Sequence, residues 1–249
     1  MTVWQALALL GAGLAAGGVN AIAGGGSLIS FPILVGIGLP GVAANVTNAL
    51  SVAPGYFASA LGSRPELAGQ RRRIVGAIPT AVAGTLCGSA LLLLTPRAAF
   101  DYVVPFLVLG ATAMMAFQGK LRRLTGHPGR HPAQLPLTIF LCGLYGGYFN
   151  AALGVLLIAG LSLVLDESIQ RVGALKNVMS AVVGLTTVLI YSIFGPVDWA
   201  AVAVLAPATI TGGVLGARLA RRLPAEILRR VIICFGAAVG VILLVEAFT

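Results

Sequence analysis

Long apolar runs separated by short polar segments make up almost the whole chain, and eight of them are near the length that crosses a membrane. A helix of about 20 apolar residues spans the ~30 Å hydrocarbon layer of a bilayer. The eight runs lie near residues 3–22, 42–62, 74–94, 99–117, 135–153, 173–194, 199–217 and 231–248. Two shorter apolar pieces, 27–38 and 154–165, follow the first and fifth runs, and we interpret them as half-helices. The pattern predicts an all-α polytopic membrane protein.

The composition agrees with a lipid environment. Hydrophobic residues make up 58% of the chain and charged residues 9%, with a mean hydropathy of +1.00, whereas a soluble domain carries roughly 25% charged residues. The first run lacks the basic start of a secretory signal, so we expect it to be retained. We interpret the net charge of +9 as a mark of the loops that stay in the cytoplasm, and we expect no nucleic-acid partner.

The two halves of the sequence repeat one another. Glycine and asparagine positions of the first half recur in the second at an offset of 130, then 129, then 128 residues: Gly13, Gly17, Asn20 and Gly24 match Gly143, Gly147, Asn150 and Gly154; Asn48 matches Asn177; and Pro79, Gly84, Gly88 and Pro96 match Pro207, Gly212, Gly216 and Pro224. We therefore predict a first repeat at 1–118, a basic cytoplasmic linker at 119–134 and a second repeat at 135–249. Each repeat holds a long helix plus a half-helix followed by three long helices.

The distribution of basic residues predicts the orientation. If the loop at 63–73 and the linker are cytoplasmic, 14 of the 16 basic residues fall inside and both termini face the exterior. Each half then has an odd number of crossings, whether its half-helix dips or spans, so the halves point in opposite directions. Inverted-topology repeats of this kind are typical of secondary transporters, whose sites lie near the midplane where discontinuous helices meet.

The chain interrupts its helices at equivalent places, after Asn20 and after Asn150. A chain break in lipid is tolerated only where it faces protein or a water-filled cavity, and glycine allows a sharp turn and a close approach to a ligand. Helix N-termini favour anions because their N–H groups are uncommitted and carry partial positive charge. We therefore expect an anion site built largely from free backbone N–H groups at Gly25, Gly26, Ser27, Leu28, Gly154 and Val155, with Gly24 at the turn.

Six further side chains are candidates for the substrate-binding site. Lys176 lies inside an apolar run, where a lysine is costly unless an anion compensates it; the alternative is that it reaches the cytoplasmic interface beside Arg171. Its counterpart in the first half is the uncharged Thr47. The amides of the two repeated pairs can line the pathway or tie down the carbonyl groups of a broken helix: Asn20 with Asn150, and Asn48 with Asn177.

These motifs resemble the TauE/SafE sulfite exporter family of bacterial inner-membrane permeases. The similarity is carried by GGVNAIAGGGSLISFP from Gly17 onward, by GLYGGYFNAALG, by ALKNVMSAVVG and by GPVDW, and it covers essentially the whole chain. The resemblance implies transport, usually outward, of sulfite, sulfonates, sulfoacetate or related small organic anions across the inner membrane. This sequence departs from the family pattern at Asn150 and Ala152, where glycine is commoner.

The sequence thus favours a secondary transporter of a small anion that works by alternating access. A passive anion channel is the alternative, and an intramembrane enzyme is less favoured because all seven acidic residues lie in loops or near run ends. The three cysteines and two histidines show no metal-ligand spacing, so we expect no metal or cofactor. Membrane lipid surrounds the chain, and a homo-oligomer is among the assemblies that the sequence allows.

Overall fold

The computed structural model is all-helical and describes residues 2–22, 24–124, 134–219 and 225–248. Ten α-helices lie in these ranges: α1 (Val3–Ile22), α2 (Ser27–Gly36), α3 (Gly41–Gly62), α4 (Arg71–Leu94), α5 (Arg97–Leu124), α6 (Gln134–Tyr148), α7 (Leu153–Val164), α8 (Ile169–Phe194), α9 (Trp199–Leu219) and α10 (Ala225–Phe248). A short 3-10 turn, Pro65–Leu67, joins α3 to α4. Most of the predicted linker, residues 125–133, lies outside the described residues.

The predicted elements are all present, and the differences are at their ends. The helices α4 and α8 begin a turn earlier than the apolar pattern predicted, because polar and basic residues such as Arg71 continue a helix beyond the hydrocarbon layer. The fifth run was expected to continue to 153, but α6 ends at Tyr148. Four described helices, α1, α4, α5 and α8, contain stretches long and apolar enough to cross a membrane.

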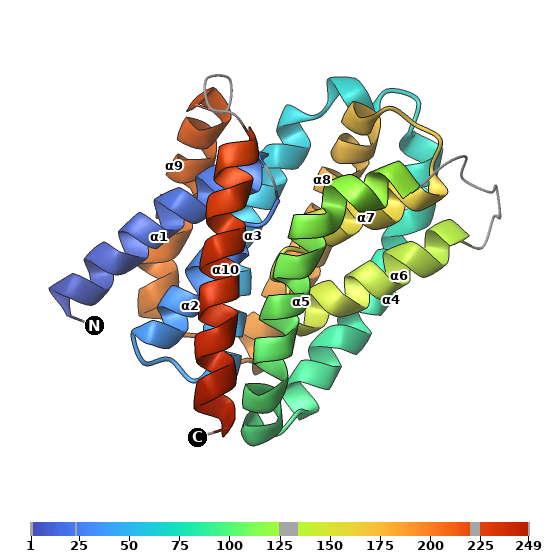
Figure 1. Cartoon of the computed structure of the whole chain (residues 1–249). Helices are drawn as coiled ribbons and strands as arrows, with labels where there is room; N and C mark the ends of the chain where they lie inside the picture. The colour runs from blue at the N-terminus through green and yellow to red at the C-terminus, as the bar shows by residue number, and fades with distance from the viewer. Residues whose placement is uncertain (1, 23, 125–133, 220–224, 249) are drawn as a thin grey trace.

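Each half begins with a helical hairpin that turns back toward the end where it started. Gln5, near the start of α1, donates its Nε2 hydrogen to the carbonyl of Ile37 just after α2, at 3.0 Å. In the second half, the later part of α7 packs on the early part of α6, where a Cβ on Gly160 would meet Cγ2 of Thr138 at 2.6 Å. Each half-helix, α2 or α7, therefore turns back along the long helix before it, and the two hairpins open at opposite ends of the molecule (Figure 1).

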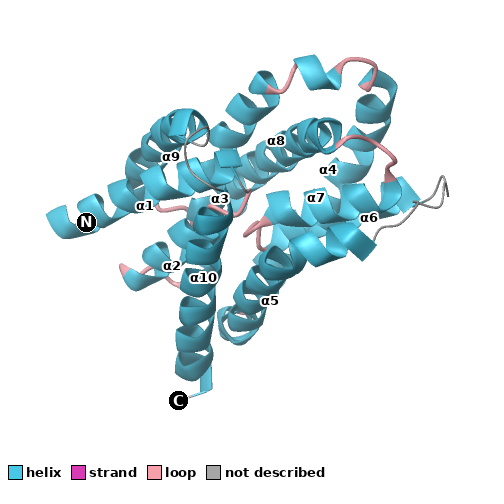
Figure 2. Ribbon diagram, turned by 45° about the horizontal axis from the view of Figure 1, so that its top comes forward, coloured by secondary structure: helices cyan, strands magenta, loops and turns pink. Residues whose placement is uncertain are grey.

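The hairpin of each half packs on a long helix of the other half, an arrangement that we call the exchanged pairing. The first hairpin packs along α9, where Gly17 lies against the backbone of Thr209 and Gly213. The second hairpin packs along α4 in the same manner, since Gly147 lies against the backbone of Thr85 and Ser89. The pairs α1 with α9 and α4 with α6 lie side by side at opposite sides of the protein (Figures 1 and 2). Small residues allow these helices to approach closely in lipid, where association depends on packing.

Between these pairs, α3 and α8 cross at the centre. Residues Ala44–Ala53 of α3 are buried without interruption, as expected for a helix surrounded by protein. An aromatic cluster lies in the core between the two hairpins, with the rings of Phe31 and Phe149 in an edge-to-face arrangement at 5.2 Å. Because Phe31 belongs to α2 and Phe149 follows α6, this contact joins the two hairpins near their tips.

Basic residues gather at the end of the molecule where α4 and α8 begin. The Arg73 guanidinium pairs with Oε1 of Glu167 at 3.0 Å, and Arg171 pairs with Oε2 of the same carboxylate at 2.7 Å. The hydrogen bond from Arg73, and to a smaller extent the one from Arg171, holds the pKa of Glu167 below its usual range. Arg97 lies at the opposite end, at the start of α5. The ion pairs join the connection before α8 to the start of α4.

Candidate functional site

The two chain breaks meet in the interior, as seen in the described residues 24–26 between α1 and α2 and 149–152 between α6 and α7. The backbones of Gly24 and Gly154 touch: a Cβ on Gly24 would lie 3.1 Å from Cα of Gly154, and one on Gly154 would lie 2.9 Å from the Gly24 carbonyl oxygen. Gly24 also has a φ of +77°, a conformation that glycine adopts at little cost. Both residues are buried, so the hairpin tips face protein and not lipid.

In the first break, the Asn20 side chain caps the half-helix. Its Oδ1 accepts a hydrogen bond from the Gly26 backbone N–H at 3.0 Å. The Leu28 N–H donates to the Gly25 carbonyl, and in the second break Val155 N–H donates to the Ala152 carbonyl. The expectation that these three N–H groups are free is therefore wrong, because the breaks satisfy them locally. An anion site here must rely more on side chains than the sequence suggested.

The second break includes Asn150 itself, whereas the sequence predicted a break after it. Asn150 and Ala152 both have a φ of 56°, in the left-handed region. Asparagine tolerates this region better than most residues, but alanine is strained there. The break is fixed further by Tyr145, whose hydroxyl donates to the Ala151 carbonyl at 2.7 Å.

Exchanging alanine for glycine should affect stability differently at the two neighbouring positions of this break. Ala151→Gly loses a buried methyl group and gains backbone entropy in the unfolded state, and both effects are destabilising. Ala152→Gly has the same costs but relieves a left-handed strain of roughly 1–2 kcal/mol. We therefore expect Ala152→Gly to melt roughly 2–8 °C above Ala151→Gly in detergent. Equal melting temperatures for the two variants would contradict the strained geometry.

A polar cluster lies where the hairpins meet α3. The Tyr56 hydroxyl donates to Oδ1 of Asn150 at 3.2 Å, and the side chains of Asn20 and Ser27 also lie near this hydroxyl. The hydroxyl of Ser27 and the Nδ2 group of Asn150 are buried without a hydrogen-bond partner. Such groups are rare in folded proteins and call for a missing partner such as water or a ligand.

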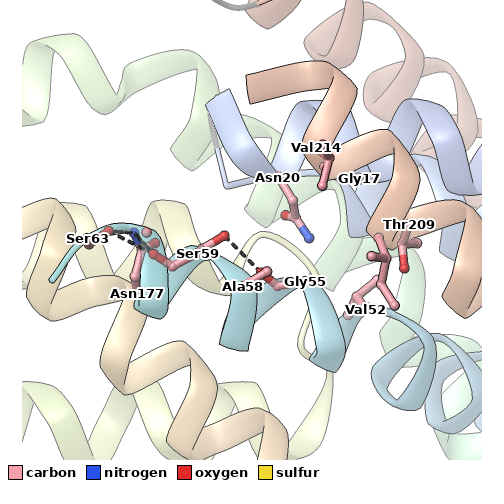
Figure 3. Close-up of a pocket in the computed structure, with 13 residues that line it drawn as sticks. Gly17, Asn20, Val52, Gly55, Ala58, Ser59, Ser63, Asn177, Thr209 and Val214 are labelled. Carbon is pink, nitrogen blue, oxygen red and sulfur yellow. Dashed lines mark hydrogen bonds between the residues drawn. The ribbon is translucent and has the colours of Figure 1, made fainter. Parts of the chain in front are cut away.

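A cavity of about 300 Å³ begins beside this cluster. Its lining comes from α1, α3, α8 and α9, and consists of Gly17, Asn20, Val52, Gly55, Ala58, Ser59, Gly62, Ser63, Asn177, Thr209, Ile210, Gly213 and Val214. Figure 3 shows the Asn20 side chain directed into the space between the labelled residues of α3 and α9. Because its Oδ1 is held by Gly26, the amide Nδ2 is the atom of Asn20 that remains to bind a solute.

The other end of the cavity lies near the basic end of the molecule. There the Nδ2 of Asn177 donates to Oγ of Ser63 at 2.7 Å, so the two side chains hold α8 against α3. Ser63 directly follows α3 and precedes Arg64. The cavity therefore runs from the hairpin tips toward the end that carries Arg73 and Arg171.

The predicted site residues fall into three groups. Asn20 and Asn177 line the cavity. The residues of the breaks are brought together at the tips, beside the cavity but not in its lining: Gly24, Gly25, Gly26, Ser27, Asn150 and Gly154. The remaining three, Thr47, Asn48 and Lys176, lie on α3 and α8 outside the lining.

These last three residues differ in their surroundings. The Thr47 hydroxyl accepts a hydrogen bond from the Asp198 N–H at 3.0 Å, which places it at the connection between α8 and α9, on the part of α3 that precedes the cavity lining. Asn48 accepts from the Ser30 hydroxyl at 2.6 Å, and its own Nδ2 has no partner. Lys176 is half-buried and has no hydrogen-bond or ion-pair partner among the described residues.

Sequence reasoning missed the α3 wall of the cavity and the role of Tyr56. Gly55, Ser59 and Gly62 recur every three or four residues and Ser63 follows them, so a stripe of small residues along one helix face was a readable signal. Nothing in the sequence indicated that this stripe would face α9. That arrangement depends on the exchanged pairing of the two halves.

Comparison with known proteins decides the family. The family model for the sulfite exporter TauE/SafE matches residues 9–243. The chain belongs to the TauE/SafE sulfite exporter family. The predicted resemblance is thereby confirmed, and with its apolar helices the chain is a multi-pass membrane protein of a transporter family.

Curated relatives of the TauE/SafE chain carry transporter names. A "Probable membrane transporter protein" of Haemophilus influenzae is 26% identical over 215 residues, which cover 83% of this chain and 82% of the relative. The "Probable membrane transporter protein ORF9" of a Sinorhizobium species is 22% identical, with 93% and 89% covered. The "Probable membrane transporter protein YfcA" of Escherichia coli K12 is 23% identical, with 93% and 87% covered. No solved structure matches the chain.

Proposed function

We propose that this TauE/SafE chain is a secondary transporter that exports sulfite, sulfonates or related small organic anions across the inner membrane. The observation that carries the proposal is the position of Asn20. Its Oδ1 caps the re-entrant half-helix, and its side chain is directed into the cavity beside the meeting point of the two hairpins. An amide donor fixed in this way can bind an anion oxygen without first being reoriented.

The cavity supports a carrier in preference to an open channel. Its lining extends from Asn20 toward Ser63 and includes no residue of the described connections at the opposite end, 37–40, 95–96 and 195–198. The cavity that contains Asn20 therefore extends toward one end of the molecule in this conformation. We assign that end to the cytoplasm because Arg71, Arg72 and Arg73 begin α4 there, in agreement with the positive-inside rule. Both termini then lie outside.

Alternating access follows if the two halves are inverted repeats. The exchanged pairing of α1 with α9 and of α6 with α4, together with hairpins that open at opposite ends, supports this relation. Movement of one hairpin and its partner helix against the other would close the present cavity and expose the tips to the exterior. The Gly24–Gly154 contact would remain the common point of both conformations.

Counterflow in proteoliposomes tests the proposal. Vesicles loaded with unlabelled sulfite should accumulate labelled sulfite transiently, and the flux should saturate with concentration, because a carrier exchanges one bound solute at a time. Flux without saturation or counterflow, together with conductance at channel rates, would identify a passive anion channel. Absence of any protein-dependent flux of sulfite, sulfoacetate or simple sulfonates would overturn the proposed substrate class.

Lys176 is expected to provide the positive charge that draws the anion into the cavity. It immediately precedes Asn177, which lines the cavity, and it lies within an apolar helix where no described residue pairs with its charge. Lys176→Gln should lower saturable flux at least tenfold, since a lost attraction between the lysine and the anion of about 1.4 kcal/mol or more is a tenfold change, while Lys176→Arg should retain most of it. Arg97→Gln makes the same charge change at the opposite end and should leave flux unchanged. Normal flux in Lys176→Gln would remove this residue from the mechanism.

A further inference from the structure

The cavity has a counterpart in the second half of the chain that is filled by a tyrosine. At the offset of 129 residues established for this part of the repeat, Ala58 and Gly62 of α3 correspond to Thr187 and Tyr191 of α8. The two α3 residues line the cavity, whereas Thr187 and Tyr191 are both almost completely buried. The duplication thus places two small residues in one half where the other half has larger ones.

The Tyr191 side chain reaches the residue of the second half that corresponds to a cavity-lining glycine of the first half. Its hydroxyl donates a hydrogen bond to the carbonyl oxygen of Gly147. Gly147 is the repeat counterpart of Gly17, which lines the cavity of the first half. The Ser89 hydroxyl donates to the same carbonyl at 3.4 Å, so Ser89 and Tyr191 meet at this point.

A second, independent observation indicates that the filled space is polar at its inner end. Asn150 corresponds to Asn20, whose side chain is directed into the first cavity. The Nδ2 group of Asn150 is buried and has no partner, and Ser180, the counterpart of Ser51, also has a buried hydroxyl without a partner. Unsatisfied buried donors are costly in the resting conformation, so their retention is consistent with a solute that reaches them in another conformation.

We propose that Ser89, Gly147, Asn150, Thr187 and Tyr191 enclose a latent crevice, and that Tyr191 is its plug. When the Tyr191 hydroxyl leaves Gly147 and the ring swings out, the crevice opens from the end opposite to the present cavity. Tyr191 thereby controls access to the protein interior from that end. This role rests on the proposed function only for the identity of the solute, a small oxyanion able to accept hydrogen bonds from Asn150.

Thiol accessibility tests the plug without relying on transport. Ser89→Cys places a thiol of similar size beside Tyr191, in a chain whose native cysteines, Cys87, Cys142 and Cys234, are replaced by serine or alanine. Ser59→Cys in the same background reports on the existing cavity. A membrane-impermeant methanethiosulfonate is added to either face of oriented vesicles. We expect Ser59→Cys to react from one face, and Ser89→Cys to react slowly from both.

Substitution of Tyr191 then tests whether its side chain closes the crevice. Tyr191→Gly, which copies Gly62, should accelerate labelling of Ser89→Cys at least tenfold, and only from the face opposite to the one that labels Ser59→Cys. Tyr191→Phe keeps the ring but loses the bond to Gly147, and should give a smaller acceleration from the same face, which also covers the case that the glycine variant does not fold. Unchanged labelling of Ser89→Cys in a folded variant, or acceleration from the Ser59 face, would overturn the proposal. Absence of sulfite flux in these vesicles would contradict the proposed function alone.

Discussion

Alanine at position 26 is expected to destabilise the fold severely, although it adds only one methyl group. Gly26 is buried at the start of α2, and a Cβ there would collide with the backbone carbonyl of Ala16 in α1. Neither group can retreat, because Ala16 lies inside a regular helix and the Gly26 N–H is held by Asn20. Overpacking of a well-packed core typically costs about 1–3 kcal/mol, and a collision with backbone is expected at the upper end of that range.

Thermal unfolding in detergent measures this effect. A loss of about 3 kcal/mol corresponds to a melting temperature roughly 6–12 °C lower for a chain of this size. Gly36→Ala is the matched control in the same helix, since a Cβ there meets no atom within 4 Å. It should melt at or slightly above the wild-type temperature, because alanine is the better helix former. Equal effects of the two substitutions would show that α1 and α2 do not pack as a hairpin.

Asn20→Asp should strongly reduce anion transport while preserving much of the fold. The carboxylate keeps an oxygen that can accept the Gly26 N–H, so the cap of α2 is retained. It removes the amide donor directed into the cavity and replaces it with a negative charge that repels an anion. Loss of a hydrogen bond to a charged group costs about 1.5–3 kcal/mol, and we therefore expect saturable sulfite flux to fall roughly 10- to 150-fold.

Gln134→Glu provides the control for the change of charge. It converts an amide to a carboxylate at the start of α6, outside the cavity lining. Its flux should remain within about twofold of wild type when expression is matched. If Asn20→Asp transported sulfite normally, or if Gln134→Glu lost transport equally, the amide of Asn20 would have no specific part in binding.

The sequence was informative about the helices and the breaks because both depend on local patterns. Apolar runs identified the helices, and the repeat of Asn20 as Asn150 located both interruptions. Glycine at positions 24 and 154 was expected to allow a sharp turn and a close approach to a ligand, and the structure places these two residues against each other. The end of α6 was misplaced because Phe149 to Leu153 is as apolar as the helix before it, so hydrophobicity does not report the turn.

The side-chain partners within the candidate site could not be read from the sequence. Whether an N–H group is free depends on the neighbour that folds back onto it, as Asn20 does onto Gly26. The position of Thr47 beside Asp198 depends on a contact between residues 151 positions apart. Likewise, the cavity exists because α1, α3 and α9 leave space between small residues, and that space depends on the exchanged pairing of the two halves.

Ligand-induced stabilisation is the most direct test of the claim that a small anion binds beside the hairpin tips. Purified wild type and Asn20→Asp are melted in sulfite, sulfoacetate or methanesulfonate, with chloride at equal ionic strength as the reference. A ligand at 100 times its dissociation constant stabilises the native state by about 2.7 kcal/mol. We predict a concentration-dependent rise in the melting temperature of wild type with at least one of these anions, and little or none for Asn20→Asp. Equal stabilisation of both proteins, or of neither, would contradict an anion site at this cavity.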